Sequence, residues 1–495
     1  MATHRYGDGY RALRGADPAR TVAYDVLREV TSQGAYANLV LPRALRAVRA
    51  DRPGFDSRDA AFASELVYGT LRGLGRLDWV LSRHLTRPVE ELDAEVRDLL
   101  RLGAHQLLDM RVPDHAAVAA TVDLAREVVT DGPVRMVNAV LRSLAREGAD
   151  RIGEDIDAIP EEDTRLAVRH SHPEWMVAAF RDALRAHGFD AMELEEVLAA
   201  DNAAPLVTLV ARPGLVDPAD LADEAEDVLG TRVAPGDVSE YAVLLESGDP
   251  AALPSVRGGL AGAQDEGSQL AAQLAATAPV EGRDRTWLDL CAGPGGKAAL
   301  MGALAQGGGA SLVANEVHPH RARLVEKAVR ALDDVEVVSG DGRTFGGART
   351  SWPLGSFDRV LVDAPCTGMG SLRRRPESRW RREPADLDDL TALQSALLDR
   401  AVDLVRPGGV LAYVTCSPHV RETRAQVERL LVRGDVELLD TVDLAQRLAP
   451  GDLDVPETAG RVLLDGVGAP GRTLRLWGHR NGTDLMFVAL LRRTR

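Results

Sequence analysis

The sequence has only three cysteines among its 495 residues: Cys291, Cys366 and Cys416. Three scattered cysteines make no disulfide framework, and this scarcity fits a reducing cytoplasm. None of the three cysteines belongs to a CxxC pair or lies near a pair of histidines in the sequence, so no metal site is expected. The three thiols are therefore predicted to be free.

Long apolar runs and an export signal are also missing. No stretch approaches the roughly 18 apolar residues needed to cross a bilayer. The opening residues, MATHRYGDGYRALRGADP, have neither an apolar core nor a cleavage signature. Apolar residues make up 45% of the chain and charged residues 27%, which is ordinary for a protein with packed cores. The expectation is a cytoplasmic protein with no membrane partner.

Lysine is almost absent, because Lys297 and Lys327 are the two lysines and arginine supplies all other basic side chains. The net charge is −16, which argues against nucleic-acid binding unless basic residues gather locally. A lysine that persists in so arginine-rich a chain is a candidate functional residue.

The chain divides into three predicted regions. Residues 18–147 repeat apolar side chains at helical spacing after Asp17-Pro18, a typical helix start, and predict a bundle of five to seven helices. In residues 148–260, the acidic segment 151–163 indicates a linker. A helical stretch to about residue 200 follows, and residues 203–258 are predicted to form a small α/β module.

Residues 261–495 alternate short apolar strands with helices. The strands WLDLCAGPGG, SLVANE, VEVVSGDG, FDRVLVDAP and GVLAYVTCS each end in small or polar residues. This alternation predicts an α/β fold with a doubly wound, mostly parallel sheet. Ligands of such sheets bind outside the carboxyl ends of the strands.

A glycine-rich loop follows the first of these strands. It consists of Cys291, Ala292, Gly293, Pro294, Gly295, Gly296 and Lys297. The loop formally satisfies the dinucleotide pattern, and it fails the P-loop pattern because Ala298 stands where serine or threonine is required.

Two carboxylates follow the next two strands. Glu316 lies 21 residues after Gly295, where an acidic side chain holds ribose hydroxyls, and Asp341 is placed to accept from an adenine amino group. Either carboxylate alone could be a turn or cap residue. Agreement at three strand ends predicts a cofactor that contains a nucleoside.

Two cysteines follow the fourth and fifth strands, in DAPCTGMG (363–370) and TCSP (415–418). Both thiols are expected to project from the carboxyl edge of the sheet. A lone free cysteine is as often a small buried apolar residue as a functional one. Asp363 is the nearest candidate acid in this group.

The set LCAGPGGK, ANE, GDG, DAPCTGMG and TCS resembles the RNA cytosine-5 methyltransferases, and most closely the RsmB/Sun (Fmu) family that acts on small-subunit ribosomal RNA. The resemblance implies S-adenosylmethionine as cofactor, bound by the glycine-rich loop with Glu316, Asp341 and Asp363. It implies that Cys416 attacks C6 of cytosine, that Cys366 helps to release the adduct, and that Asp363 contacts N3. DNA cytosine-5 methyltransferases use the PC cysteine and lack the TC cysteine, so both together point to RNA. Lys297 is either a cofactor contact or a solvated lysine in the first turn of a helix.

The resemblance covers nearly the whole chain, from about residue 18 to 493. GAYANLVL (34–41), SRDAAFASELVYGTLR (57–72) and VNAVLRSL (137–144) are similar to the NusB-like RNA-binding domain fused to these enzymes, and LRLWGHRNGTDLMFVALLRR (474–493) to the family's last hairpin. The family often continues its TC motif to Glu-Asn, whereas this chain has Glu422-Thr423.

Arginines crowd the segment after the PC motif, around one tryptophan. The segment contains Arg373, Arg374, Arg375, Arg379, Trp380, Arg381 and Arg382. Arginine forks suit phosphates and an aromatic ring can stack on a base, so RNA contact is expected, although such a run is usually a solvated face.

The sequence therefore predicts a monomeric ribosomal RNA cytosine-5 methyltransferase, with regions 18–147, 148–260 and 261–495. Transfer RNA is the alternative substrate. The alternative functions are an NAD-dependent dehydrogenase, supported only by the glycine pattern, and a non-catalytic RNA-binding or antitermination factor built on the N-terminal region.

Overall fold

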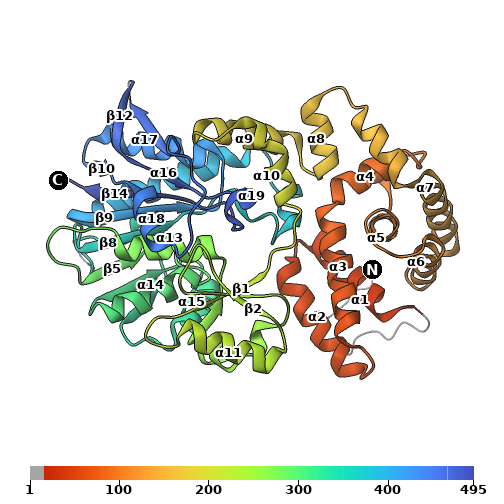
Figure 1. Cartoon of the computed structure of the whole chain (residues 1–495), viewed down its shortest axis with the longest axis horizontal. Coiled ribbons are helices and arrows are strands. Elements are labelled where there is room, and N and C mark those ends of the chain that lie inside the picture. Colours follow the sequence, from red (N-terminus) through yellow and green to blue (C-terminus); the bar gives the residue numbers. More distant parts are fainter. Residues whose placement is uncertain (1–15, 349, 465) are drawn as a thin grey trace. The chain divides into compact units, whose positions relative to one another are not determined.

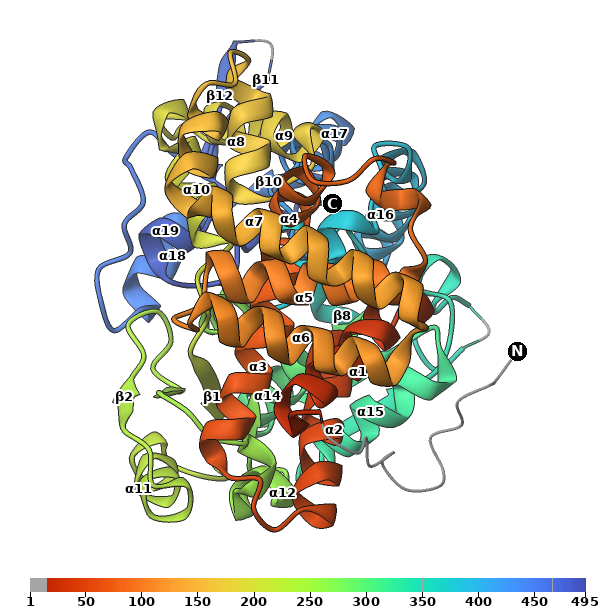
Figure 2. The same cartoon turned by 90° about the vertical axis from the view of Figure 1, so that its right-hand side faces the viewer.

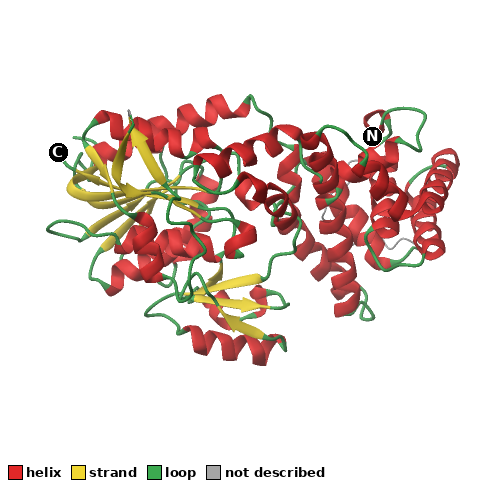
Figure 3. Cartoon of the chain, turned by 45° about the horizontal axis from the view of Figure 1, so that its top comes forward, coloured by secondary structure: helices red, strands yellow, loops and turns green. Residues whose placement is uncertain are grey.

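The computed structural model describes residues 16–348, 350–464 and 466–495, so the first 15 residues of the opening segment lie outside the described residues. The chain forms two compact units. The helical unit comprises the residues up to 177 together with 372–381, and the sheet unit comprises 178–371 and 382–495. Figure 3 shows that the strands belong to the sheet unit, and within the described residues the other unit is helical.

The helical unit packs its helices around one apolar core. Figure 2 shows α5, α6 and α7 packed side by side within it. Its α-helices are α1 (Pro18–Gln33), α2 (Ala37–Asp51), α3 (Ser57–Arg72), α4 (Leu74–Ser82), α5 (Ala94–Leu108), α6 (Asp114–Val128), α7 (Asp131–Asp157) and α8 (Glu162–His170).

The start of α1 follows the sequence prediction. The Asp17 carboxylate accepts a hydrogen bond from the main-chain N–H of Arg20 at 2.9 Å, and Pro18 occupies the first turn, where its missing N–H costs nothing. Val22, Val26 and the other apolar residues at helical spacing are buried in the core. This confirms the helical reading of the region.

The prediction of a linker at residues 151–163 is wrong for most of its length. Residues 151–157 belong to α7, which contains a non-helical kink at Gly148, and α8 begins at Glu162. Ile152 and Ile156, four residues apart, are buried in the core of the helical unit. The acidic side chains between them only mark the outer face of an amphipathic helix.

The main sheet of the sheet unit has the strand order β10-β14-β9-β8-β5-β6-β7, with β13 paired to β14. Strands β5 to β9 are parallel, and β14 enters antiparallel between β9 and β10. The strands are β5 (Thr286–Asp289), β6 (Ser311–Asn315), β7 (Val335–Val338), β8 (Phe357–Asp363), β9 (Val405–Thr415), β10 (Val436–Leu438), β13 (Leu474–Arg475) and β14 (Phe487–Arg493).

Helices cover both faces of this sheet (Figure 1), which confirms the predicted doubly wound architecture. Along β9, Val410, Ala412 and Val414 join one core, whereas Leu411 and Tyr413 join the other, because successive strand residues point to opposite faces. The first core includes residues of α13 (Glu266–Thr277), α14 (Gly296–Gly307), α15 (Pro319–Val329) and α18 (Thr441–Leu448), and the second those of α16 (Asp386–Leu404) and α17 (Arg424–Arg433).

The predicted small α/β module is present as an antiparallel sheet of order β2-β3-β1-β4. Its elements are β1 (Val207–Ala211), α11 (Pro218–Leu229), β2 (Val233–Pro235), β3 (Ala242–Leu245), α12 (Pro254–Gly258) and β4 (Ala261–Ala263). Three further helices of the chain are α9 (Glu174–Ala186), α10 (Leu194–Ala200) and α19 (Gly478–Asn481).

Two short strands, β11 (Arg461–Leu464) and β12 (Val467–Arg472), form a separate hairpin. In the part of the chain that the structure describes, no helix combines the length and the apolar character that a membrane span requires.

Candidate active site

The strand order creates one crevice at the carboxyl edge of the main sheet. β5 lies between β6 and β8, so the connections from β5 and from β8 leave the sheet in opposite directions. Such a switch point is where open α/β sheets bind ligands. The glycine-rich loop follows β5, Glu316 follows β6, and Asp363 ends β8.

Two glycines shape the loop between β5 and α14. Gly295 has a φ of 108°, and a Cβ there would lie 2.7 Å from the Cβ of Ala328. At Gly293 a Cβ would lie 2.1 Å from the Glu316 carboxylate. The missing side chains therefore let the loop approach both α15 and Glu316. No side chain caps the N-terminus of α14, which leaves its first N–H groups to other partners.

The β6 end is held by a residue that the sequence prediction missed. The side-chain amide of Asn315 donates to the main-chain carbonyls of Leu290 and Gly340, both at 3.0 Å, and ties three strand ends together. Glu316, almost fully buried, accepts from the N–H of His318 at 2.9 Å. In the sequence, the position of Asn315 directly before Glu316 in the ANE segment was the feature that could have indicated its role.

Asp341 points elsewhere. Its carboxylate accepts from the main-chain N–H of Arg343 at 2.9 Å and pairs with that guanidinium at 2.6 Å. The hydrogen bonds from Arg343 lower the pKa of Asp341. The structure thus gives this carboxylate the role of a turn residue, and its predicted adenine contact stays a prediction.

Lys297 and Asp363 form an ion pair in the crevice, with Nζ 2.9 Å from Oδ2. Burial alone would lower the pKa of Lys297, but the Asp363 carboxylate raises it above its ordinary value. The lysine is therefore charged, and it is not the solvated surface lysine that the sequence left open.

The two predicted cysteines meet beside this pair. The sulfur atoms of Cys366 and Cys416 are 3.5 Å apart. The hydrogen bond from Cys366 lowers the pKa of Cys416, and the positive charge of Lys297 lowers it further. The same contact, together with burial, raises the pKa of Cys366 well above that of a free thiol. The opposite directions of the two pKa shifts favour Cys416 as the thiol that ionises and Cys366 as its hydrogen-bond donor.

The departure from the family's Glu-Asn pair is accommodated locally. The Thr423 hydroxyl donates to the main-chain carbonyl of His419 at 2.9 Å and lies 3.2 Å from Nε2 of His187. Burial lowers the pKa of His187 well below its ordinary value, so this imidazole is neutral. The preceding residue, Glu422, is fully buried, and the sequence prediction gave it no role.

Within the arginine-rich segment, Arg379 is buried and does not lie at the surface. Residues 372–381 belong to the helical unit, where Arg379 is 0% exposed. Its guanidinium donates to the main-chain carbonyls of Arg72 at 3.0 Å and Ser171 at 3.2 Å. These bonds give the buried guanidinium a structural role in the helical unit, and the predicted RNA contact of Arg379 stays a prediction.

The rest of the segment is more varied. Arg375 is exposed and lies over the ring of Tyr36 at 5.5 Å, and Arg381 covers the same ring at 4.9 Å. Trp380 is 40% exposed and packs on Gly75, where a Cβ would lie 2.4 Å from its ring. The remaining arginines are Arg373, which is buried, Arg374, which is half-buried, and Arg382, which lies in the sheet unit.

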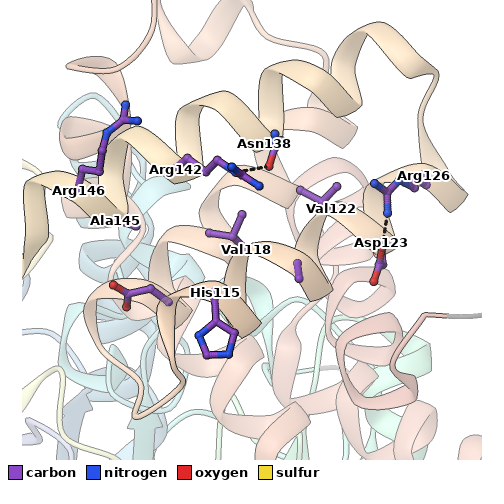
Figure 4. A pocket seen from close by; sticks show the side chains of 11 residues that line it. His115, Val118, Val122, Asp123, Arg126, Asn138, Arg142, Ala145 and Arg146 are labelled. Carbon is purple, nitrogen blue, oxygen red and sulfur yellow. Dashed lines mark hydrogen bonds and ion pairs between the residues drawn. The ribbon is translucent and has the colours of Figure 1, made fainter.

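A cavity of about 540 Å³ lies in the helical unit between α6 and α7. Figure 4 shows Val118 and Val122 on one helix and Arg142 and Arg146 on the other. None of the cysteines lines it, so it is separate from the chemistry described above. In the described residues, no group of three or more His, Cys, Asp or Glu side chains could hold a metal ion.

Comparisons with known proteins agree with this architecture. A family model described as "16S rRNA methyltransferase RsmB/F" matches residues 276–492, and one described as "NusB family" matches residues 17–146. The chain is 46% identical over 482 residues to a Mycobacterium tuberculosis protein named "putative methyltransferase", covering 97% of each chain.

Two further relatives extend the comparison. The ribosomal RNA small subunit methyltransferase B of Erwinia tasmaniensis is 33% identical over 451 residues, covering 89% of this chain and 96% of that protein. The crystal structure of the protein PH0851 shares the fold, with a TM-score of 0.71 at 20% identity, covering 96% of this chain and 98% of the other. The chain therefore belongs to the RsmB/F family of methyltransferases, with an N-terminal domain of the NusB family.

Proposed function

We propose that this methyltransferase transfers a methyl group from S-adenosylmethionine to C5 of a cytidine in RNA, and that its substrate is small-subunit (16S) ribosomal RNA. The observation that carries the proposal is the Cys416 thiol, 3.5 Å from Cys366 and beside the Lys297–Asp363 pair, at the switch point of the sheet. Family membership and the name of the Erwinia relative support the RNA substrate. The three-region division at 18–147, 148–260 and 261–495 is part of the same proposal, with region 18–147 binding RNA.

The loop after β5 fits the proposed cofactor. Gly293 and Gly295 leave a cradle that side chains would fill, and the free end of α14 suits a carboxylate. Within the described residues, the buried Oδ2 of Asp289 and Oδ1 of Asn315 have no hydrogen-bond partner. Burial, helped by the negative charge of Asp363, raises the pKa of Asp289 to about 8. A nucleoside and an amino acid offer both kinds of partner: an acceptor for the protonated Asp289 carboxyl and a donor for the Asn315 oxygen.

When bound, the cofactor supplies an electrophilic methyl group. The chain's own task is to make C5 of cytosine nucleophilic, which an unaided ring is not. The Cys416 thiolate adds to C6, and the electron pair of the C5–C6 double bond becomes available at C5. The ion pair with Lys297 holds Asp363 in the crevice. To act on N3, where negative charge develops as the thiolate adds, Asp363 must carry a proton and donate it, because an ionised carboxylate only accepts hydrogen bonds.

Release reverses the addition. The methylated ring must lose its C5 proton, the C5–C6 double bond forms again, and the bond from C6 to the Cys416 sulfur breaks. The C5 proton passes to solvent, and Cys416 leaves as the thiolate in which it attacked. Cys366 is the group beside that sulfur, and as a thiol it can hydrogen-bond the departing thiolate. The reaction therefore restores both cysteines to their starting state, with one proton passed to solvent.

Bisulfite sequencing of RNA from a deletion strain tests the proposal, because 5-methylcytidine resists conversion to uridine. The expected result is the loss of one protected cytidine in small-subunit ribosomal RNA and its return when the gene is restored. Loss of protection in transfer RNA alone would move the proposal to that substrate. Unchanged protection in every RNA would refute methylation of RNA cytosines by this protein.

A further inference from the structure

A fully buried carboxylate links the two loops that carry the cysteines. Glu422, in η7 (Val420–Glu422), is not exposed to solvent. Its Oε1 accepts from the main-chain N–H of Thr367 at 2.9 Å and from the side-chain amide of Gln394 at 3.1 Å. Its Oε2 accepts from the hydroxyl of Thr367 at 2.6 Å and from that of Ser417 at 2.5 Å.

These bonds join segments that lie far apart in the sequence. Thr367 directly follows Cys366, and Ser417 directly follows Cys416. The two hydroxyls are 3.0 Å from each other, so the carboxylate and both hydroxyls form one closed group. Burying a carboxylate is costly unless its oxygens are hydrogen-bonded. Here all the compensating bonds from the two thiol loops converge on Glu422.

A second buried ion holds the same residue from another direction. The guanidinium of Arg475 donates to the main-chain carbonyl of Ser417 at 2.7 Å and to that of Leu485 at 3.3 Å. Arg475 is also fully buried. Ser417 is therefore fixed through its hydroxyl by Glu422 and through its carbonyl by Arg475, which leaves the adjoining Cys416 little freedom.

We propose that Glu422 is a positioning residue that fixes the separation between the Cys416 and Cys366 sulfur atoms. The thiol of Cys366 then lies next to the adduct that Cys416 forms. The inference rests on the proposed function for its catalytic consequence, but not for the geometric one. Glu422 touches neither thiol, and it acts through Thr367 and Ser417.

The chemistry of the site favours a carboxylate over an amide. A carboxylate only accepts hydrogen bonds, and all four groups around Glu422 donate to it. In Glu422→Gln, the amide nitrogen would face the two hydroxyls, which would have to turn and accept, so that their own protons lose the carboxylate. The bonds that join the two loops would then lose the charge that strengthens them, and the link would be weaker.

The test compares Glu422→Gln with Glu266→Gln in the full-length protein. Glu266, in α13, is a matched control because it is also buried and accepts from the main-chain N–H groups of Val238 and Ser239, away from the cysteine loops. The first measurement is the rate at which the oxidant diamide joins Cys366 to Cys416, followed by mass spectrometry of unreduced peptides. The second is kcat and KM for methyl transfer to RNA.

We expect Glu422→Gln to slow disulfide formation at least fivefold, to lower kcat at least tenfold with KM within twofold, and to accumulate the covalent RNA complex. Glu266→Gln should match the wild type in all of these. A Glu422→Gln protein with wild-type disulfide and methylation rates would overturn the proposal, even if its melting temperature fell. The same holds if both variants lose activity equally.

If Glu422→Gln does not fold, Thr367→Val removes the hydroxyl contacts to Glu422 and Ser417 and keeps the main-chain bond to the carboxylate. Its disulfide rate should fall about twofold or more, and an unchanged rate counts against the proposal. Should the wild type methylate no RNA, the proposed function fails, yet the diamide comparison still decides whether Glu422 sets the thiol separation.

Discussion

At the scale of single residues, the two thiols are close in space but opposite in their ionisation. The pKa of Cys416 is lowered and that of Cys366 is raised, and each direction has the same cause, the hydrogen bond between them. This asymmetry agrees with the separate tasks that the proposed mechanism gives to the two cysteines. It also makes their substitution diagnostic.

Cys416→Ala should bind RNA and cofactor yet transfer no methyl group, because the bond to C6 never forms. Cys366→Ala should methylate and then stall as a covalent protein–RNA complex. Denaturing electrophoresis with and without RNase detects that complex, and the double variant serves as the control that shows none. A complex that forms in Cys416→Ala and needs Cys366 would reverse the assignment.

The reactivity of the thiols should depend on pH in a predictable direction. Because the pKa of Cys416 is lowered, its thiolate persists at lower pH than that of an ordinary cysteine, and iodoacetamide should modify it first. Lys297→Met removes a positive charge that favours the thiolate, so the pH at half-maximal modification should rise. Peptide mapping identifies the site, and Lys327→Met, which changes a lysine elsewhere, is the control. Identical pH profiles for Lys297→Met and the wild type would separate Lys297 from the thiol.

At the scale of elements, the arginines of segment 372–381 differ in burial although they carry the same charge. Its arginines are alike in sequence, yet Arg379 is buried on carbonyls and Arg375 is exposed. Nothing in the run itself distinguishes them, because the difference arises from α3, α8 and the chain after it, which lie some 200 to 300 residues earlier.

Substitution of Arg379 and of Arg375 should therefore affect different properties of the protein. Arg379→Ala leaves main-chain carbonyls without a donor and should lower the free energy of unfolding by about 1–3 kcal/mol. Arg375→Ala should leave stability unchanged, weaken RNA binding and reduce the slope of its salt dependence by about 1. Denaturant unfolding and a salt series of RNA titrations measure the two effects. If Arg375→Ala binds RNA with the wild-type salt slope, this segment does not contact RNA.

The elements themselves were largely predictable, because local signals fix them. Apolar segments that end in small or polar residues predicted β5 to β9, and the Asp17-Pro18 cap predicted the start of α1. The linker prediction failed because the acidic composition of residues 151–163 hides a helical spacing, shown by the buried Ile152 and Ile156. The bonds of Glu422 and Asn315 were beyond prediction, since each depends on loops that meet only after the sheet has formed.

At the scale of the whole molecule, the question of cofactor class can be put to the intact protein. The glycine-rich loop alone allowed a nicotinamide dinucleotide, and membership of a methyltransferase family speaks against it. A ligand that binds only the folded chain raises its stability according to its concentration relative to Kd.

S-adenosylhomocysteine at 100 times its Kd should stabilise the protein by about 2.7 kcal/mol and raise Tm, whereas NADH should not. Glu316→Ala should lose about 1.5–3 kcal/mol of cofactor binding, the range for hydrogen bonds to a charged group. Thermal unfolding and calorimetry provide the readouts, with circular dichroism to establish that the variant is folded. A rise in Tm with NADH and none with S-adenosylhomocysteine would contradict the assignment.

The position of β14 has a consequence for the order in which the protein is made. β14 pairs with β9, the strand that leads to Cys416, and Arg475 in the preceding β13 holds Ser417. A ribosome synthesises β9 more than 70 residues before it completes β14. During that interval the growing chain presents the edge of β9 without a partner, which is the kind of edge that invites aggregation. Cys416, at the end of β9, is thus among the last parts of the sheet unit to be fixed by its neighbours, because β14 and Arg475 are synthesised after it.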